Sequence, residues 1–250
     1  SMLFDYGIAN GMGGFEHDYL DYNYLSMPYL RKTHGAAHKW LSAINTAAVK
    51  RGLPVQMCMA LPSDLMASLI FESVTNFRAS TDYGIDDDRF NIPIQPNDDN
   101  FNIGASSLLG FALGLRPSKD IFWTHRPDNC RGDPTRNPKA CGRWGADPRG
   151  KHTNPGSNCE LNAIVATLST GPLSIADKAG DTNASLIARC VRADGRILQP
   201  DKPATAVDST FLQHGGAPPG FVWSSYTNVS GLIWHYVLSV DVSTPWRLRG

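Results

Sequence analysis

Short strand-like runs alternate with helical stretches along most of the chain, and this alternation constrains its fold more than any other feature. Strands are predicted over residues 14–20, 54–60, 74–80, 120–124 and 172–176. Helices are predicted over residues 28–52, 63–71, 103–113, 160–168 and 184–191. Strands and helices that alternate through short connections are typical of a parallel sheet with crossover helices.

The pattern changes near residue 204. Strands without intervening helices are predicted over residues 221–223, 231–240 and 246–248. A run of strands of this kind indicates an antiparallel β module. We therefore divide the chain into an α/β unit, residues 1–203, and the start of an antiparallel β domain, residues 204–250.

The charge balance excludes several kinds of partner. The 250 residues include 23 Lys and Arg and 23 Asp and Glu, so the formal net charge is zero. Nucleic-acid binders normally carry a basic stripe, and proteins held at a membrane surface carry a polybasic segment. No stretch approaches the roughly 20 apolar residues that cross a bilayer. We therefore expect neither a nucleic acid nor a membrane as a partner.

The cysteines and two glycosylation tripeptides bear on metals and compartment. None of the five cysteines forms a CxxC pair, so we predict no metal site. The pairing among Cys130, Cys141 and Cys159 stays open at this point. Tripeptides that begin at Asn183 and Asn228 fit glycosylation in the secretory pathway, although such tripeptides also arise by chance.

Polar residues gather where the predicted strands end, which is where chemistry sits in a parallel α/β barrel. These residues are Glu16, His17, Asp18, Cys58, Arg78, Asp82, Asp120, Trp123 and Asp177. Two carboxylates, such as Asp18 and Asp82, are the minimum equipment for cleavage of a glycosidic bond. One carboxylate must stay ionised, and the other must hold a proton that it gives to the leaving oxygen.

The sequence around these residues resembles the α-galactosidase clan of retaining glycoside hydrolases, and most closely the alkaline α-galactosidase and raffinose-synthase group. Residues 77–83 are similar to the clan's aromatic-Arg-x-x-x-Asp motif. Residues 16–20 stand in the place of the strand with the nucleophile, and residues 56–59 resemble the strand that follows it. Residues 102–124 and 171–178 resemble later elements of the barrel, so the resemblance covers most of residues 14–210 in the same order.

The resemblance implies a retaining α-glycosidase that acts on α-linked galactosides, by hydrolysis or by transfer, without a cofactor. Asp18 would be the nucleophile and Asp82 the general acid/base. Arg78 would bind the sugar hydroxyl beside the anomeric carbon. The remaining candidates for contact with the carbohydrate substrate are Glu16, Cys58, Asp120, Trp123 and Asp177.

Two departures from the clan pattern affect these expectations. Glu16 stands where the clan often has a Lys that contacts the sugar. In addition, the clan's nucleophile follows the fourth of eight barrel strands, whereas here it would be residue 18. A complete barrel takes about 250 residues. The chain therefore resembles the second half of a (β/α)8 barrel followed by the start of a β module. Such a half needs a second copy or an N-terminal companion segment to cover its open edges.

Each candidate also has a purely structural interpretation. Asp18 fits a turn or a helix cap, and Asp82 fits an ion pair with Arg78. Cys58 fits a small buried apolar residue, and Asp120 and Asp177 fit helix caps. On these interpretations the chain is a catalytically inactive sugar-binding or interaction protein that is built on a truncated glycosidase scaffold.

Overall fold

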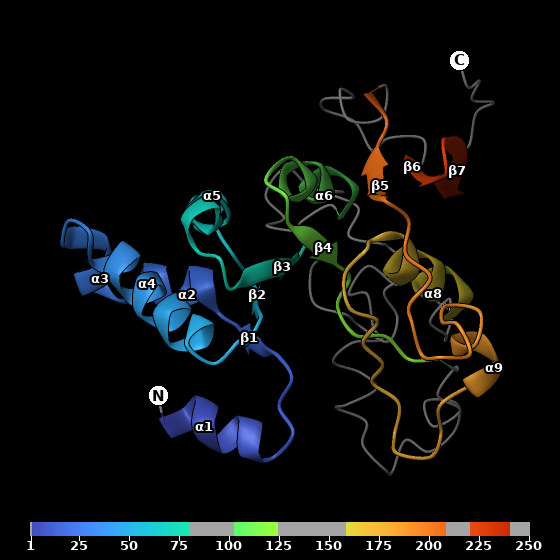
Figure 1. The fold of residues 1–250 in the computed structure, drawn as a ribbon. Helices are drawn as coiled ribbons and strands as arrows, with labels where there is room; N and C mark the ends of the chain where they lie inside the picture. The colour runs from blue at the N-terminus through green and yellow to red at the C-terminus, as the bar shows by residue number, and fades with distance from the viewer. Residues whose placement is uncertain (1, 81–102, 125–158, 209–220, 241–250) are drawn as a thin grey trace, which may run out of the picture.

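The chain folds into a mixed α/β structure with two sheets (Figure 1). The computed structural model describes residues 2–80, 103–124, 159–208 and 221–240. One sheet is parallel, with the strand order β1-β2-β3-β4. Its strands are β1 (Phe15–His17), β2 (Val55–Met57), β3 (Val74–Arg78) and β4 (Arg116–Ser118). The predicted parallel sheet with alternating helices is thus confirmed, and its strands follow one another in chain order.

The fourth predicted strand, over residues 120–124, is wrong in position. Helix α6 (Ile103–Ala112) is followed by Gly114, whose φ of 78° suits glycine, and the chain then enters the sheet as β4 at Arg116. The apolar run that follows β4 forms only a parallel bridge between Phe122 and Ile175. Of the strand predicted over residues 172–176, only Ile175 makes a strand-type pairing, as the partner of Phe122 in this bridge.

The described helices lie before, between and after the parallel strands. They are α1 (Met2–Ala9), α2 (Leu20–Ser26), α3 (Pro28–Lys32), α4 (Ala36–Val49), α5 (Pro62–Ala67), the 3-10 turn η1 (Ser68–Ile70), α6, α8 (Cys159–Leu168) and α9 (Ala184–Ile187). Helices α2 to α4 connect β1 to β2, and α5 with η1 connects β2 to β3 (Figure 1). No helix among the described residues is long and apolar enough to cross a membrane.

Two helix predictions and one strand prediction need correction. The single helix expected over residues 28–52 is two helices, α3 and α4, because the chain turns at Gly35 with a φ of 73°. The strand expected over residues 14–20 stops at His17, and Leu20 already begins α2. The helix expected over residues 184–191 ends at Ile187.

The β module is an antiparallel sheet, as predicted, and the first of its three described strands, over residues 202–206, was not predicted. Its strands are β5 (Lys202–Ala206), β6 (Phe221–Val229) and β7 (Leu232–Val240), in the order β5-β6-β7. The hairpin turn between β6 and β7 is Ser230-Gly231, and both residues have positive φ, as a tight type I′ turn requires. Strand β6 runs six residues beyond the predicted stretch 221–223. The strand predicted over residues 246–248 lies outside the described residues.

The two sheets share one hydrophobic core. Met57 and Phe77 of the parallel sheet belong to the same buried cluster as Trp223 of β6. Helix α6 lies between them: a Cβ at Gly104 would overlap the indole of Trp223, and a Cβ at Gly110 would overlap the ring of Phe77. The two glycines therefore allow α6 to approach both sheets closely.

Candidate functional site

The parallel strands place polar side chains on one face of the sheet. Residues two apart in a strand point to the same face, and the register aligns Glu16 with Gln56 and Gln56 with Asn76. Arg78 is aligned with Ser118. The residues of this polar face are Glu16, Asp18, Gln56, Cys58, Asn76, Arg78, Ser80, Ser118 and Asp120. The opposite face carries Met57 and Phe77, which the core covers.

Glu16, Asp18 and Cys58 form a tight cluster where β1 and β2 end. Their carboxylate oxygens and thiol sulfur all lie within 4.8 Å of one another. Glu16 is exposed, Asp18 is half-buried and Cys58 is fully buried. Asp18 Oδ1 also accepts the backbone N–H of Tyr19 at 2.7 Å. The carboxylate of Asp18, the predicted nucleophile, therefore lies at the carboxyl end of β1 and is held by the backbone of the next residue.

The Cys58 thiol stays protonated in this cluster. Burial raises its pKa most, and hydrogen bonding to the carboxylates of Asp18 and Glu16 raises it further, while the positive charge of Arg78 acts in the opposite direction. A protonated thiol donates a hydrogen bond and is a poor nucleophile and a poor metal ligand. The three side chains lie close enough together to hold one metal ion, and binding would require the thiol to lose its proton.

Arg78 joins this cluster to the next strand. Its Nη1 lies 3.2 Å from Oδ2 of Asp120, and both side chains are mostly buried. The backbone N–H of Asp120 donates to Ser80 Oγ at 2.8 Å, which fixes the residue at the end of β4. Two residues before Arg78 on β3, the side-chain amide of Asn76 donates to the side-chain oxygen of Gln56 on β2. Carboxylates and one guanidinium therefore alternate along the carboxyl edge of the four parallel strands.

The backbone turns sharply at the first two strand ends. Tyr19 and Met59, which directly follow Asp18 and Cys58, have φ values of 58° and 50°. Non-glycine residues in this left-handed region cost free energy and occur where the surrounding structure requires them. Backbone hydrogen bonds hold both turns, because Asp21 N–H donates to the Met59 carbonyl at 2.9 Å and Cys58 N–H to the His17 carbonyl at 2.9 Å.

The remaining candidates lie outside this group. Asp177 accepts the backbone N–H of Thr124 at 2.9 Å and its hydroxyl at 2.6 Å, so it fastens the chain beside the Phe122 bridge. Trp123 is half-buried on that same segment. His17 lies on the opposite face of β1 and packs edge-on against Trp40, with ring centroids 4.9 Å apart. Asp82, the predicted general acid/base, lies outside the described residues.

The structure thus brings together five of the predicted site residues: Glu16, Asp18, Cys58, Arg78 and Asp120. Sequence reasoning missed the polar residues that support them, Gln56, Asn76 and Ser80. The signal was present, because strands of parallel sheets usually read as continuous apolar runs. Residues 55–58 and 76–80 instead alternate between apolar and polar side chains.

Comparison with known proteins adds no relative to this description. No family model matches the chain, and no curated protein matches its sequence.

Proposed function

We propose that the chain is part of a retaining α-glycosidase of the α-galactosidase type, with Asp18 as its nucleophile. The observation that supports this proposal is the position of Asp18. Its carboxylate lies at the carboxyl end of a parallel strand, among Glu16, Cys58 and the Arg78–Asp120 pair. Polar side chains from adjacent strand ends that converge in this way are typical of α/β-barrel active sites.

The strand order supports the half-barrel part of the proposal. In an α/β barrel, successive parallel strands are neighbours, whereas a doubly wound sheet reverses its order at one point. The order β1-β2-β3-β4 has no reversal, and the Phe122–Ile175 bridge adds a further parallel contact after β4. The free edge of β1 would then be covered by an N-terminal companion segment or by a second copy of the chain.

In the proposed reaction, Asp18 attacks the anomeric carbon of the bound sugar. The bond to the leaving oxygen breaks as Asp82 gives that oxygen a proton, and the sugar becomes an ester of Asp18. Asp82 then takes a proton from water, whose oxygen attacks the same carbon and frees Asp18; a sugar hydroxyl in place of water gives transfer. Retention requires the two carboxyl groups to lie about 5–5.5 Å apart.

The neighbours of Asp18 suit this role. The Cys58 thiol donates to the carboxylate and carries no negative charge, so it orients Asp18 without repelling it. Arg78 supplies a positive charge beside this cluster, and the N–H donors of its guanidinium suit a sugar hydroxyl. Asp120 holds Arg78 in place through the 3.2 Å ion pair.

The proposal is tested with the full chain and an aryl α-galactoside. Asp18→Asn should abolish turnover, and azide should restore cleavage in Asp18→Gly by taking the place of the missing carboxylate. Asp21→Asn is the matched control, because Asp21 is an acid three residues away that bonds the backbone N–H of Tyr22. Turnover that survives in Asp18→Asn overturns the role of Asp18.

A second candidate, a sugar-binding protein without catalysis, is favoured by one observation. Glu16 places a second carboxylate within 4.8 Å of the predicted nucleophile Asp18, at the position where the clan often has a Lys that contacts the sugar. On this alternative, the wild-type chain binds α-galactosides with no turnover, and Asp18→Asn changes the affinity little. Calorimetric titration with galactose, beside the turnover assay, separates the two functions.

A further inference from the structure

Four exposed apolar side chains form a stripe that begins at the residue before α2 and continues over α2 and α3. They are Tyr19, Tyr22, Leu25 and Tyr29, at spacings of three, three and four residues, and each is between 55% and 67% exposed. Leu20 and Leu30, on the inner side of the same helices, are buried. A surface helix normally turns polar residues to solvent. An outward apolar face of this kind marks a binding surface.

This tyrosine stripe begins at the candidate site. Tyr19 directly follows Asp18, and its left-handed backbone conformation turns the chain from β1 into α2. The rings of Tyr19 and Tyr22 lie edge to face, with centroids 6.3 Å apart. The hydrogen bond from Asp21 N–H to the Met59 carbonyl ties the first turn of α2 to the end of β2. A molecule that is bound at Asp18 can therefore continue onto the stripe.

The chemistry of the stripe fits sugar rings. Three of its four members are tyrosines, each of which offers an apolar ring face and a hydroxyl that donates and accepts. A pyranose offers the matching pair, a face of C–H groups and a rim of hydroxyls. No member of the stripe is charged. The seven residues of α2 alone extend over about 10 Å, which is longer than a single sugar ring.

We propose that the tyrosine stripe binds the leaving-group part of an oligosaccharide or polysaccharide substrate, beyond the sugar that Asp18 attacks. The inference rests on the proposed function and narrows it from small α-galactosides to extended glycans. Tyr22 and Tyr29 carry most of this contact, because they are the tyrosines of the stripe that lie on α2 and α3, beyond the turn at Tyr19.

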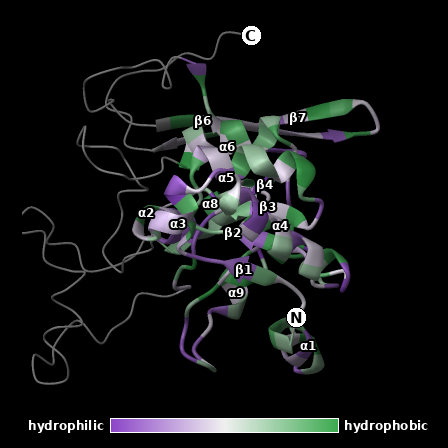
Figure 2. Cartoon of the chain, turned by 90° about the vertical axis from the view of Figure 1, so that its left-hand side faces the viewer, coloured by the Kyte–Doolittle hydropathy of each residue, from purple (hydrophilic) through white to green (hydrophobic). Residues whose placement is uncertain are grey.

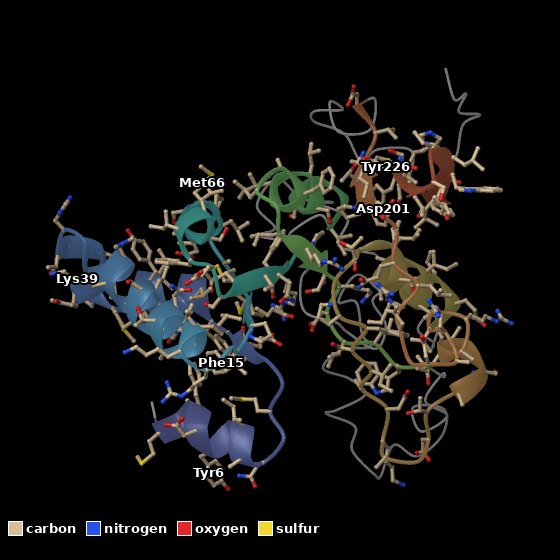
Figure 3. The ribbon with its side chains drawn as sticks, viewed as in Figure 1. Tyr6, Phe15, Lys39, Met66, Asp201 and Tyr226 are labelled. Carbon is tan, nitrogen blue, oxygen red and sulfur yellow. The ribbon has the colours of Figure 1, made fainter. Side chains whose placement is uncertain are left out.

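Binding to the Asp18→Asn chain tests the stripe without any need for turnover. Calorimetric titration should show that an α-galactosyl-substituted mannan oligosaccharide binds more tightly than free galactose. Tyr22→Ala/Tyr29→Ala should lower the ratio of the two affinities about fivefold or more, since each aromatic contact contributes roughly a factor of a few. Tyr6→Ala is the matched control: Tyr6 is 71% exposed on α1 (Figure 3), and the ratio should not change.

The outcomes separate the two proposals. Equal affinity for galactose and the oligosaccharide overturns the stripe, whether or not the wild-type chain turns over an aryl galactoside. Absence of aryl galactoside turnover, together with a length-dependent affinity that the two tyrosines control, supports the stripe and overturns only the catalytic role. A second copy of the chain is the other molecule that could cover the stripe. Sedimentation of the Asp18→Asn chain with and without Tyr22→Ala/Tyr29→Ala tests this. A dimer that dissociates when the two tyrosines are replaced would overturn the proposal.

Discussion

The two faces of the parallel sheet are made by the same strands and serve opposite purposes. In β2, Val55 and Met57 are buried in the hydrophobic core, whereas Gln56 and the following Cys58 belong to the polar face. Several polar residues on that face are held by a neighbour on or just after an adjacent strand, as Asn76 is by Gln56 and Arg78 is by Asp120. The comparison teaches that, because successive side chains point to opposite faces, one short parallel strand can supply both a buried apolar face and a polar face.

The largest expected effect comes from the core face. Phe77→Ala removes a ring that packs among α6, the parallel sheet and the shared core, and it should lower the free energy of unfolding by about 3–5 kcal/mol. Urea unfolding followed by circular dichroism measures it. A loss below about 1 kcal/mol would show that the core face is not closely packed.

The next effect comes from the polar face. Arg78→Met leaves the mostly buried carboxylate of Asp120 without its ion-pair partner and should cost about 2–4 kcal/mol. The double variant Arg78→Met/Asp120→Asn should recover much of this loss, because no unpaired charge remains. Urea unfolding of both single variants and the double variant completes the cycle. Additive losses would contradict a direct coupling between the two side chains.

A smaller effect links the two faces through consecutive residues. Burial lowers the pKa of His17, and the charge of Asp18 partly opposes this shift. The folded state therefore binds fewer protons than the unfolded state, and stability falls as the pH drops below about 6.5. Wild-type stability should fall more between pH 7 and pH 5 than that of His17→Phe. Proton NMR titration should also place the pKa of His17 lower in Asp18→Asn than in the wild type.

The smallest expected effect concerns Cys58. Cys58→Ala removes a buried thiol beside the carboxylates of Asp18 and Glu16, and it should change the free energy of unfolding by roughly 1 kcal/mol. Iodoacetamide at pH 8 should leave Cys58 unmodified in the folded protein and alkylate it in urea, as peptide mass spectrometry would show. Rapid alkylation of the folded protein would mean that the thiol is neither buried nor protonated.

The sequence predicts strands and helices best where the apolar character of a short run comes from that element alone. The apolar runs of β2 and β3 are found where expected, and so are α6 and α8. The run over residues 120–124 is misleading because Phe122 is buried against α8 and α9 as well as bridged to Ile175, so its apolar character reports packing. The polar β4 is a strand because β3 pairs with it. Such a tertiary effect leaves no local pattern.

The site was predicted in part. The strand-end rule identified Asp18, Cys58, Arg78 and Asp120, because parallel strands bring their carboxyl ends to one edge. The rule says nothing of which side chains meet, so neither the thiol–carboxylate cluster nor the Arg78–Asp120 pair was expected. Asp177, for which a sugar contact or a helix cap was predicted, accepts two hydrogen bonds from Thr124, and its contact with sugar stays a prediction. Helix α2 was missed because its Asp, Asn and Tyr residues are weak helix formers.

The packing of Trp223 has a consequence for how the chain loses its structure. Its indole lies against Gly104 of α6, and it belongs to the same buried cluster as Met57 and Phe77. Figure 2 shows β6, β7 and α6 close together at one end of the molecule. Neither sheet can lose its order without baring part of the other, so heating should melt both in one cooperative transition. Residues 1–203 expressed alone would expose the face of α6 that Trp223 covers, and that fragment would be prone to aggregation.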